Sequence, residues 1–338
     1  MSKIHVLLVY GGQSSEHDIS LMSARNVYAA IDDAKYQVTP CLIDKQGHWW
    51  LQEDISDHHT GHPQLLPVFG QKKFITLPDH KIIQPDVIYP VLHGKWGEDG
   101  TIQGFAEMMN MPCVGPSVLG AALTMEKGMT KRLLEADGIP VTPSCTWKTH
   151  LPKPEFERIK HRLGTTLFVK PSRSGSSVGV TKITSQNDWH QALDEAAKHD
   201  SIILIEKAIN ARELEVAVLG NENPMVAGPG EILPGEEFYS YDDKYAETAT
   251  SSVAIPADVD EATAQSVREL ALRAYVATGG RGMARIDFFL DRSSGELYLN
   301  EINSLPGFTN ISMYPKLWQH DGVKYPQLVD RLIQLALE

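Results

Sequence analysis

The sequence predicts a chain of mixed α/β and α+β structure that is divided into two or three domains. Its 338 residues exceed the length of one ordinary domain. Short β-branched runs alternate with helical stretches over the first third of the chain, which is typical of strand–helix–strand units. Near the C-terminus two apolar runs flank a polar turn, which indicates antiparallel structure there.

The first domain is expected over residues 1–122 and to contain a doubly wound, parallel sheet. Ile4–Tyr10 is a continuous apolar run that ends at two glycines, as a buried strand would. Further strands are expected at 38–43, 87–92 and 113–114, and helices at 19–31 and 100–110. This alternation of strands and helices predicts the parallel arrangement.

A small middle domain and a larger, β-rich third domain are expected over residues 123–212 and 213–338. The middle domain is predicted to contain helices at 124–136 and 187–198 and strands at 167–170, 178–183 and 202–206. The third is predicted to contain strands between 214 and 232, a helix at 261–278, a hairpin at 284–302 and a closing helix at 325–337. The aperiodic segment 234–252 is long for a loop in a compact domain, which favours a functional role.

The composition excludes several classes of partner. A net charge of −12 provides no general attraction for nucleic acid or an anionic membrane, so any phosphate site must be a local cluster of Lys and Arg. No apolar run approaches the roughly 20 residues of a membrane helix, and the first is too short for a signal-peptide core. Cys41, Cys113 and Cys145 are widely spaced, as reduced thiols usually are. We expect a cytoplasmic protein.

The predicted hairpin carries a polar face. Pairing about its turn places Arg285 opposite Asn303, and the same register places Asp287 opposite Glu301. Because side chains alternate along a strand, these four groups lie on one side of the hairpin. The opposite, core-facing side would be formed by Ile286, Phe288, Leu290 and Ile302. A slip of one residue would divide the polar groups between the two faces.

Two carboxylates and an amide oxygen on one face are hard ligands. They suit Mg²⁺, which keeps several waters and takes its remaining ligands from phosphate oxygens. From these residues alone, a solvated face with an Arg–Asp pair is equally compatible with the pattern.

A loop rich in serine and glycine, residues 170–179, joins two predicted strands and begins with Lys170. Glycines let the backbone approach a ligand closely, and successive N–H groups can bind an anion. The loop is not a Walker A motif, and the first strand does not lead into the G-x-G-x-x-G of a dinucleotide site, which counts against an oxidoreductase. A phosphate-binding loop and an ordinary surface turn both remain open on this pattern.

Four segments, in this order, resemble the motifs of the D-alanine–D-alanine ligases of the ATP-grasp superfamily. They are Gly11–Ser20, His93–Gly100 (H-G-x-x-G-E-D-G), Lys170–Gly179 (K-P-x-x-x-G-S-S-x-G) and Asn300–Thr309. Each string is moderately specific, but four with the correct order and spacing are strongly so. The resemblance covers nearly the whole chain. It implies the ATP-grasp fold, with a doubly wound N-terminal domain followed by a small central and a larger C-terminal ATP-grasp domain.

The resemblance also implies the reaction and its site. ATP would lie between the central and C-terminal domains, bound by Lys127, Lys170, Glu206, Lys207, Ile209, Glu213 and Lys244. Two Mg²⁺ ions, with Mn²⁺ as a substitute, would be held by Asp287, Glu301 and Asn303. The catalytic groups would be Glu16, Ser176, Tyr245, Arg285 and the backbone N–H of Gly307. His93, Ser312 and Met313 would bind substrate.

The implied activity is ATP-dependent ligation of two D-alanines through a D-alanyl phosphate, which supplies a precursor of peptidoglycan. Segment 234–252 would form a lid, and Tyr245 on it favours the dipeptide over D-Ala-D-Lac. D-Ala-D-Ser or D-Ala-D-Lac synthesis is the alternative reaction, and a catalytically silent nucleotide-binding protein is an alternative of another class. A homodimer through the N-terminal domain is expected from the family alone.

Overall fold

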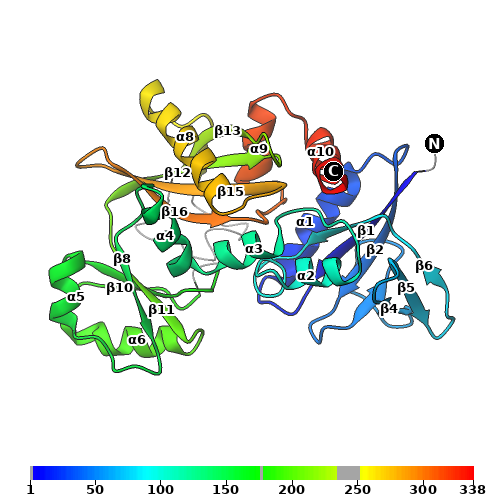
Figure 1. Ribbon diagram of the computed structural model, residues 1–338, viewed down its shortest axis with the longest axis horizontal. Coiled ribbons are helices and arrows are strands. Elements are labelled where there is room, and N and C mark those ends of the chain that lie inside the picture. The colour runs from blue at the N-terminus through cyan, green and yellow to red at the C-terminus, as the bar shows by residue number, and fades with distance from the viewer. Residues whose placement is uncertain (1–2, 176–177, 234–251) are drawn as a thin grey trace.

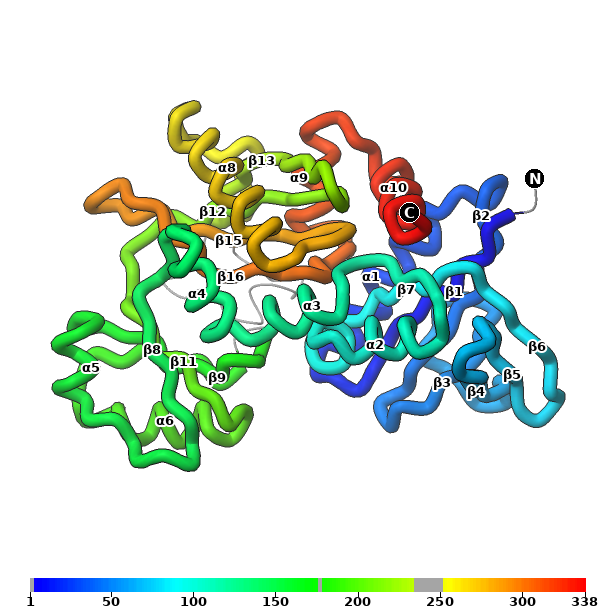
Figure 2. Tube along the Cα trace, viewed as in Figure 1, coloured from blue at the N-terminus to red at the C-terminus, as the bar shows by residue number. Residues whose placement is uncertain are grey.

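The computed structural model describes residues 3–175, 178–233 and 252–338. They form three β-sheets with helices packed against them, and the predicted mixed α/β class is confirmed (Figure 1). The N-terminal sheet lies at one end of the molecule, and the other two lie together at the opposite end. In Figure 2 the chain passes between the two ends through helices α3 (Val118–Met125) and α4 (Lys127–Ala136).

The N-terminal sheet has seven strands in the order β6-β5-β4-β3-β2-β1-β7. The three predicted strands pair in parallel at one side of it, β1 (Ile4–Gly11) between β2 (Tyr36–Ile43) and β7 (Val87–Val91). Along β1, Leu7 and Val9 contribute to one core while Leu8 and Tyr10 contribute to another. Helices α1 (His17–Ala30) and α2 (Thr101–Met108) cover these two faces, as expected of a doubly wound unit.

Four short antiparallel strands, which were not predicted, extend this doubly wound parallel part of the sheet. These strands are β3 (Trp49–Leu51), β4 (Gln64–Val68), β5 (Lys73–Leu77) and β6 (Ile82–Ile83). They bury few side chains, and even in β5 only Phe74 and Thr76 are buried while the other residues are half-buried. Strands covered on one face alternate in polarity and lack the continuous apolar run that identified β1. The predicted strand at 113–114 is reduced to a single bridge between Cys113 and Ile88.

The middle sheet is antiparallel, in the order β10-β9-β11-β8. It comprises β8 (Ser144–Lys148), β9 (Leu167–Pro171), β10 (Thr181–Ile183) and β11 (Ile202–Lys207), with α5 (Phe156–Leu163), the 3-10 turn η1 (Gln186–Asp188) and α6 (Trp189–Ala197). Sequence analysis did not predict β8 or α5. The helix predicted at 124–136 is also broken in two at Glu126. The Glu126 carboxylate accepts hydrogen bonds from the N–H groups of Gly128 and Met129, which caps α4.

The C-terminal sheet is antiparallel, in the order β14-β13-β12-β15-β16. Its strands are β12 (Ala211–Leu219), β13 (Met225–Leu233), β14 (Ser252–Ala254), β15 (Met283–Asp291) and β16 (Leu297–Asn303). Its helices are α8 (Glu261–Ala277), α9 (Met313–His320) and α10 (Tyr325–Leu337). Helices α8 and α10 were predicted, whereas α9 was not.

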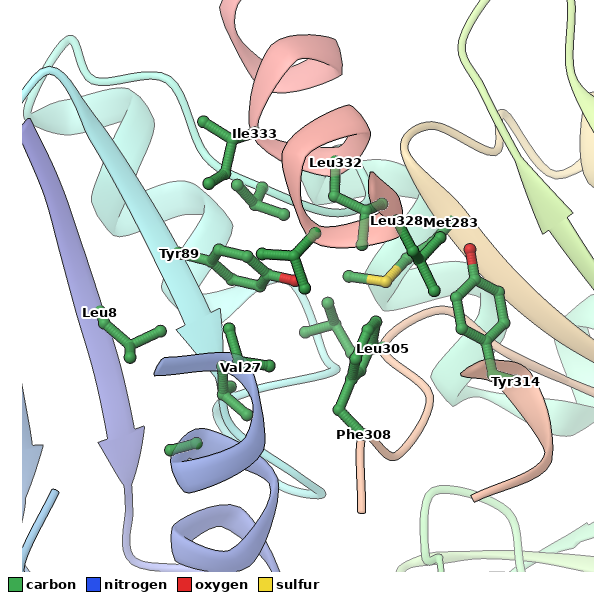
Figure 3. Close-up of a cluster of buried hydrophobic side chains, with 14 of the residues drawn as sticks. Leu8, Val27, Tyr89, Met283, Leu305, Phe308, Tyr314, Leu328, Leu332 and Ile333 are labelled. Carbon is green, nitrogen blue, oxygen red and sulfur yellow. The ribbon is translucent and has the colours of Figure 1, made fainter. Parts of the chain in front are cut away.

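One hydrophobic core joins the two ends of the chain. Leu8 and Tyr89 of the first sheet and Val27 of α1 belong to the same buried cluster as Leu328 and Leu332 of α10. In Figure 3 the α10 side chains lie over Tyr89, with Leu305 and Phe308 beneath them. Helix α10 also packs directly against α1 and β7. The last helix therefore anchors the C-terminal sheet to the N-terminal unit.

The three sheets follow the three predicted domains in order, although β12 begins at Ala211, before the predicted boundary at 212/213. The shared core joins the outer two domains. The exact boundaries at 122/123 and 212/213 remain predictions. None of the helices in residues 3–175, 178–233 and 252–338 is both long and apolar enough to cross a bilayer.

Leu328→Ala is expected to lower the free energy of unfolding by about 2–5 kcal/mol, because it opens a cavity in the shared core. Leu328 is fully buried, whereas Leu119 on α3 is 72% exposed. Leu119→Ala is the matched control, with an expected change within about 0.5 kcal/mol. Urea unfolding followed by circular dichroism measures both. Equal effects of the two substitutions would show that α10 does not anchor the units.

Candidate active site

The predicted register of the hairpin is confirmed where the polar residues lie. Arg285 pairs with Asn303, and Asp287 pairs with Glu301. A bulge follows Asp287, so the strand pairs nearer the turn are shifted by one residue. Because the bulge lies beyond all four polar residues, they stay on one face. Of the predicted core-facing residues, Ile286, Phe288 and Ile302 are buried and Leu290 packs against the same core.

Arg285 is held between two carboxylates. Its guanidinium donates to both Asp287 oxygens at 2.8 Å and lies 3.1 Å from Glu215 on β12. Burial alone would lower the pKa of Arg285, but Asp287 and Glu215 outweigh burial and raise it well above its usual value. Strand β12 pairs with β15 so that Glu215 faces Asp287, which explains this contact. Arg285 is thus a fixed positive charge on the polar face.

The donor set on this face fits a hard divalent cation. The Asn303 amide donates to Asp287 at 3.0 Å, so the ligands predicted from these two residues are in contact. Glu301 lies opposite Asp287 in the hairpin. No group of three or more His, Cys, Asp and Glu side chains able to hold a metal occurs in the described part of the chain. A set of two carboxylates and one amide needs further oxygens from elsewhere, and phosphate is the usual source.

Lys127 connects this face to the serine- and glycine-rich loop. Its ammonium lies 3.5 Å from Glu301 and donates to the Ser174 carbonyl at 2.9 Å. The capping residue Glu126 also accepts a hydrogen bond from the Ser172 hydroxyl. Ser172 and Ser174 lie in the loop after β9, so Glu126 and Lys127 tie the start of α4 to that loop. The loop is therefore positioned over the hairpin face, as the sequence interpretation required.

Behind the loop, Glu206 is buried between two lysines. Its carboxylate lies 2.5 Å from the Lys170 ammonium and 2.8 Å from that of Lys131. Burial would raise the pKa of Glu206, but the two ammonium groups reverse this and lower it. Burial lowers the pKa of Lys131, whereas Glu206 and Glu301 outweigh burial and raise that of Lys170. The cluster gives Lys170 a stable positive charge beside the loop.

Glu16 and His93 follow neighbouring parallel strands. Glu16 precedes α1 after β1, and His93 follows β7, so both lie at the carboxyl edge of the first sheet. The order of strands reverses there, since β2 and β7 flank β1, and such switch points form binding crevices. Ser14 accepts from the Glu16 N–H at 3.2 Å and donates to the His93 carbonyl at 2.7 Å. Gly94 has φ +71°, and a Cβ there would lie 2.5 Å from the Glu16 carboxylate, so this approach requires glycine.

A single pocket brings half of the predicted site residues together from all three units. It is lined by nine of them, namely Glu16, His93, Lys127, Arg285, Glu301, Asn303, Gly307, Ser312 and Met313. His93 is buried in its wall, 3.8 Å from Glu98. Burial would lower the pKa of His93, but Glu98 and then Glu16 raise it. The pocket is therefore lined by charged groups of both signs, with Lys127 and Arg285 near Glu16 and Glu301.

Other predicted residues lie outside this pocket. Asp287, Lys170 and Glu206 adjoin it through the contacts above, whereas Lys207, Ile209 and Glu213 lie farther along the β11–β12 connection. Glu213 still contributes to raising the pKa of Lys170. Ser176, Lys244 and Tyr245 lie outside the described residues, as does the predicted lid up to residue 251.

Sequence reasoning missed three charged residues of the site. Lys131 lies one helical turn after Lys127 on α4, and this i, i+4 spacing could have identified it. Glu98 lies within the H-G-x-x-G-E-D-G segment and lines the pocket 3.8 Å from His93, but no part in the site was predicted for it. Glu215 left no signal in the sequence, because only strand pairing brings it to Arg285.

Lys131→Met is expected to lower the free energy of unfolding by about 3 kcal/mol, since removing one partner leaves buried charge less compensated. Lys182→Met is the control, because Lys182 is an exposed residue of the same unit. Urea unfolding of both variants measures the difference. A loss no larger than that of the control would mean that Lys131 does not stabilise Glu206.

The chain was compared with families of known proteins. The family described as D-ala D-ala ligase N-terminus matches residues 5–116, and the one described as D-ala D-ala ligase C-terminus matches residues 133–334. D-alanine–D-alanine ligase A of Chromobacterium violaceum is 44% identical, over 100% of this chain and 96% of that protein. A D-alanine–D-alanine ligase of Thermoanaerobacter sp. is also 44% identical, over 100% of this chain and 98% of that protein.

Solved structures agree with these matches. The D-alanine–D-alanine ligase from Coxiella burnetii superposes with a TM-score of 0.88 at 34% identity, covering 100% of this chain and 94% of its own. The VanG D-Ala:D-Ser ligase from Enterococcus faecalis superposes with a TM-score of 0.90 at 32% identity, covering 99% and 100%. The likeness confirms the predicted ATP-grasp fold. The chain belongs to the D-alanine–D-alanine ligase family.

Proposed function

We propose that this protein joins two D-alanines into D-alanyl-D-alanine and converts ATP into ADP and phosphate. The observation that carries the proposal is the pocket itself, in which Glu16 of the first sheet and Arg285 of the hairpin line one cavity with Lys127. The cavity thus combines three groups with different partners. The Glu16 carboxylate can bind a substrate ammonium, the Arg285 guanidinium can stabilise an oxyanion, and the Lys127 ammonium can bind phosphate. Relatives at 41–45% identity that are named D-alanine–D-alanine ligases support the same conclusion.

ATP is proposed to bind between the middle and C-terminal sheets. Lys127 and Lys170, with their positions set by Glu301 and Glu206, supply charge for the phosphates. The Ser- and Gly-rich loop adds backbone donors. Segment Glu206–Ile209 at the end of β11, which includes Lys207, would bind the adenine, and Glu213 would bind the ribose. Lys244, which is also proposed to contact the nucleotide, lies outside the described residues.

Asp287, Glu301 and Asn303 are proposed to hold Mg²⁺, for which Mn²⁺ could substitute. When bound, the ions would neutralise the charge of the phosphates and orient them. The Asp287 oxygens accept hydrogen bonds from Arg285 and Asn303, which compensate the charge of this carboxylate.

The reaction needs activation, because a carboxylate is a poor electrophile. The carboxylate of the first D-alanine attacks the γ-phosphorus of ATP, and ADP leaves. The amine of the second D-alanine then attacks the carbonyl carbon of the acyl phosphate and loses a proton. Collapse of the tetrahedral intermediate forms the amide and expels phosphate. Positioning and charge stabilisation provide most of the catalysis in such transfers.

Residues of the pocket have distinct proposed parts in these steps. Glu16 binds the ammonium of the first D-alanine, and Ser176 and Tyr245 complete its network. Arg285 and the Gly307 N–H stabilise the oxyanion, and such a donor contributes about 3 kcal/mol. The remaining substrate contacts would come from His93, Ser312 and Met313. The Ser312 hydroxyl accepts from the Thr309 N–H at 3.0 Å, which fixes it at the start of α9.

A cytoplasmic protein that acts in peptidoglycan precursor synthesis is proposed on the same grounds. A homodimer through the N-terminal unit is also proposed. Its support is a set of exposed apolar side chains, namely Leu66 on β4, Phe69 just after β4, Ile82 on β6 and Met108 on α2. Sedimentation equilibrium tests the dimer, and a Phe69→Asp variant is expected to weaken it.

Glu301→Gln is expected to reduce turnover by about 100-fold or more, since metal coordination contributes several kcal/mol and each ~1.4 kcal/mol is tenfold. Glu296→Gln, an exposed residue of the same hairpin, is the control. ADP release with D-alanine and Mg²⁺ measures both, and circular dichroism checks the fold. EDTA is expected to stop the unmodified protein, and Mg²⁺ or Mn²⁺ to restore it. Full activity of Glu301→Gln would remove the hairpin from the chemistry.

ADP release by the unmodified protein is expected to depend on added D-alanine, with one dipeptide formed per ADP. With D-serine or D-lactate offered beside D-alanine, the dipeptide should remain the main product. Mass spectrometry of the products measures this preference. A main product of D-Ala-D-Ser or D-Ala-D-Lac would favour the alternative reaction, and D-alanine-independent ADP release would overturn the proposed ligase.

A further inference from the structure

The main chain of Phe308 is held by side chains from both ends of the sequence. Its N–H donates to the Ser23 hydroxyl at 3.3 Å. Its carbonyl accepts from the Asn26 amide at 3.0 Å and from the Tyr325 hydroxyl at 2.8 Å. Ser23 and Asn26 belong to α1, and Tyr325 begins α10. Both main-chain polar groups of Phe308 are thus bound.

These bonds are protected from water. Ser23 is fully buried and Phe308 is 2% exposed. In Figure 3 the Phe308 and Leu305 side chains lie between Val27 of α1 and Tyr314 of α9. A buried N–H that loses its partner is costly, so the bond to Ser23 restrains the main chain more strongly than an exposed bond would.

Ser23 also contacts the wall of the pocket. Its hydroxyl lies 3.1 Å from Nε2 of His93, so one oxygen bonds to a pocket residue and to the Phe308 N–H. Leu305 also belongs to the same buried cluster as Val27 of α1. The loop on either side of Gly307 is therefore tied to the N-terminal unit at both Leu305 and Phe308.

This linkage fixes the distance between the two halves of the pocket. Glu16 is the residue before the first turn of α1, and Ser23 lies seven residues later on the same helix. A helix is rigid, with a rise of about 1.5 Å per residue. Gly307 precedes Phe308 in the chain. Glu16 is thus linked to the Gly307 N–H by two turns of α1, by the Ser23–Phe308 hydrogen bond and by one residue of main chain.

We infer that Ser23 is a positioning residue for the ligation, because its hydroxyl holds the Gly307 N–H in register with Glu16. The inference rests on the proposed function, in which Glu16 binds the first D-alanine and Gly307 stabilises the oxyanion. Ser23 touches neither substrate in this account. It acts through the Phe308 peptide, and Asn26 assists it from the next turn of α1.

The alternative is that Ser23 only stabilises the contact between the two units. Tyr36 provides a matched control for that alternative. Its hydroxyl donates to Asp330 at 2.8 Å and accepts from Gln334 at 2.8 Å, which also joins the first sheet to α10. Ser23 and Tyr36 are both buried, and neither lines the pocket. Ser23 differs from Tyr36 in its contact with His93, which does line the pocket.

Ser23→Ala is expected to lower kcat at least about tenfold, because small misplacements of a catalytic donor are costly. The KM for ATP should stay within about twofold, since no nucleotide group is moved. Asn26→Ala should have a smaller effect, because Tyr325 still binds the same carbonyl. Tyr36→Phe should lower the unfolding temperature by about as much as Ser23→Ala does, while kcat is retained. Amide exchange of Phe308 should accelerate in Ser23→Ala alone.

Two results would overturn the inference by itself. One is a kcat of Ser23→Ala that equals that of the unmodified protein, and the other is an equal loss of kcat in Tyr36→Phe. If the unmodified protein released no ADP in response to D-alanine, the proposed function would fail, and the role of Ser23 in ligation with it. The rate of ADP release by the unmodified protein is therefore measured first, which separates the two failures.

Discussion

Across β15 and β16, Arg285 faces Asn303 and Asp287 faces Glu301, and the remainder of the site depends on this register. A shift by one residue would turn half of these groups into the core, where Ile286 and its neighbours are buried. The bulge after Asp287 lets the hairpin reach its turn without disturbing that pairing. Pairing with β12 then adds Glu215 to the same face. The register is what makes the hairpin a site and not only an edge of the sheet.

Opposite charges are paired in the pocket and beside it. Arg285 lies between Asp287 and Glu215, Lys127 lies beside Glu301, and Glu206 lies between two lysines. Burying an unpaired charge is expensive, so such pairing stabilises the protein without ligands. Under the proposed function, nucleotide and divalent ions arrive with matching charges of both signs. The lysines would then pair with phosphates in place of carboxylates, and the carboxylates would bind metal in place of lysines.

Three separate units contribute to one pocket, so their relative placement matters as much as their individual folds. The buried cluster that joins α1, β7 and α10 supplies most of that placement through apolar packing. Packing alone is not directional, whereas the hydrogen bonds at Phe308 are. The combination of a broad apolar contact with a few directional bonds gives the loop around Gly307 a defined position beside the Glu16 end of α1.

Local pattern was sufficient for the parallel strands, the long amphipathic helices and the register of the hairpin, because each depends on the spacing of neighbouring residues. Four ordered motifs were sufficient for the family. The antiparallel strands β3–β6 and the break at Glu126 were not predicted, since half-buried strands alternate weakly and a cap is visible only when its acceptor bonds are formed. The contacts of Lys131, Glu215 and Ser23 were decided by the tertiary structure alone, because their partners lie 70 or more residues away and only folding brings these groups together.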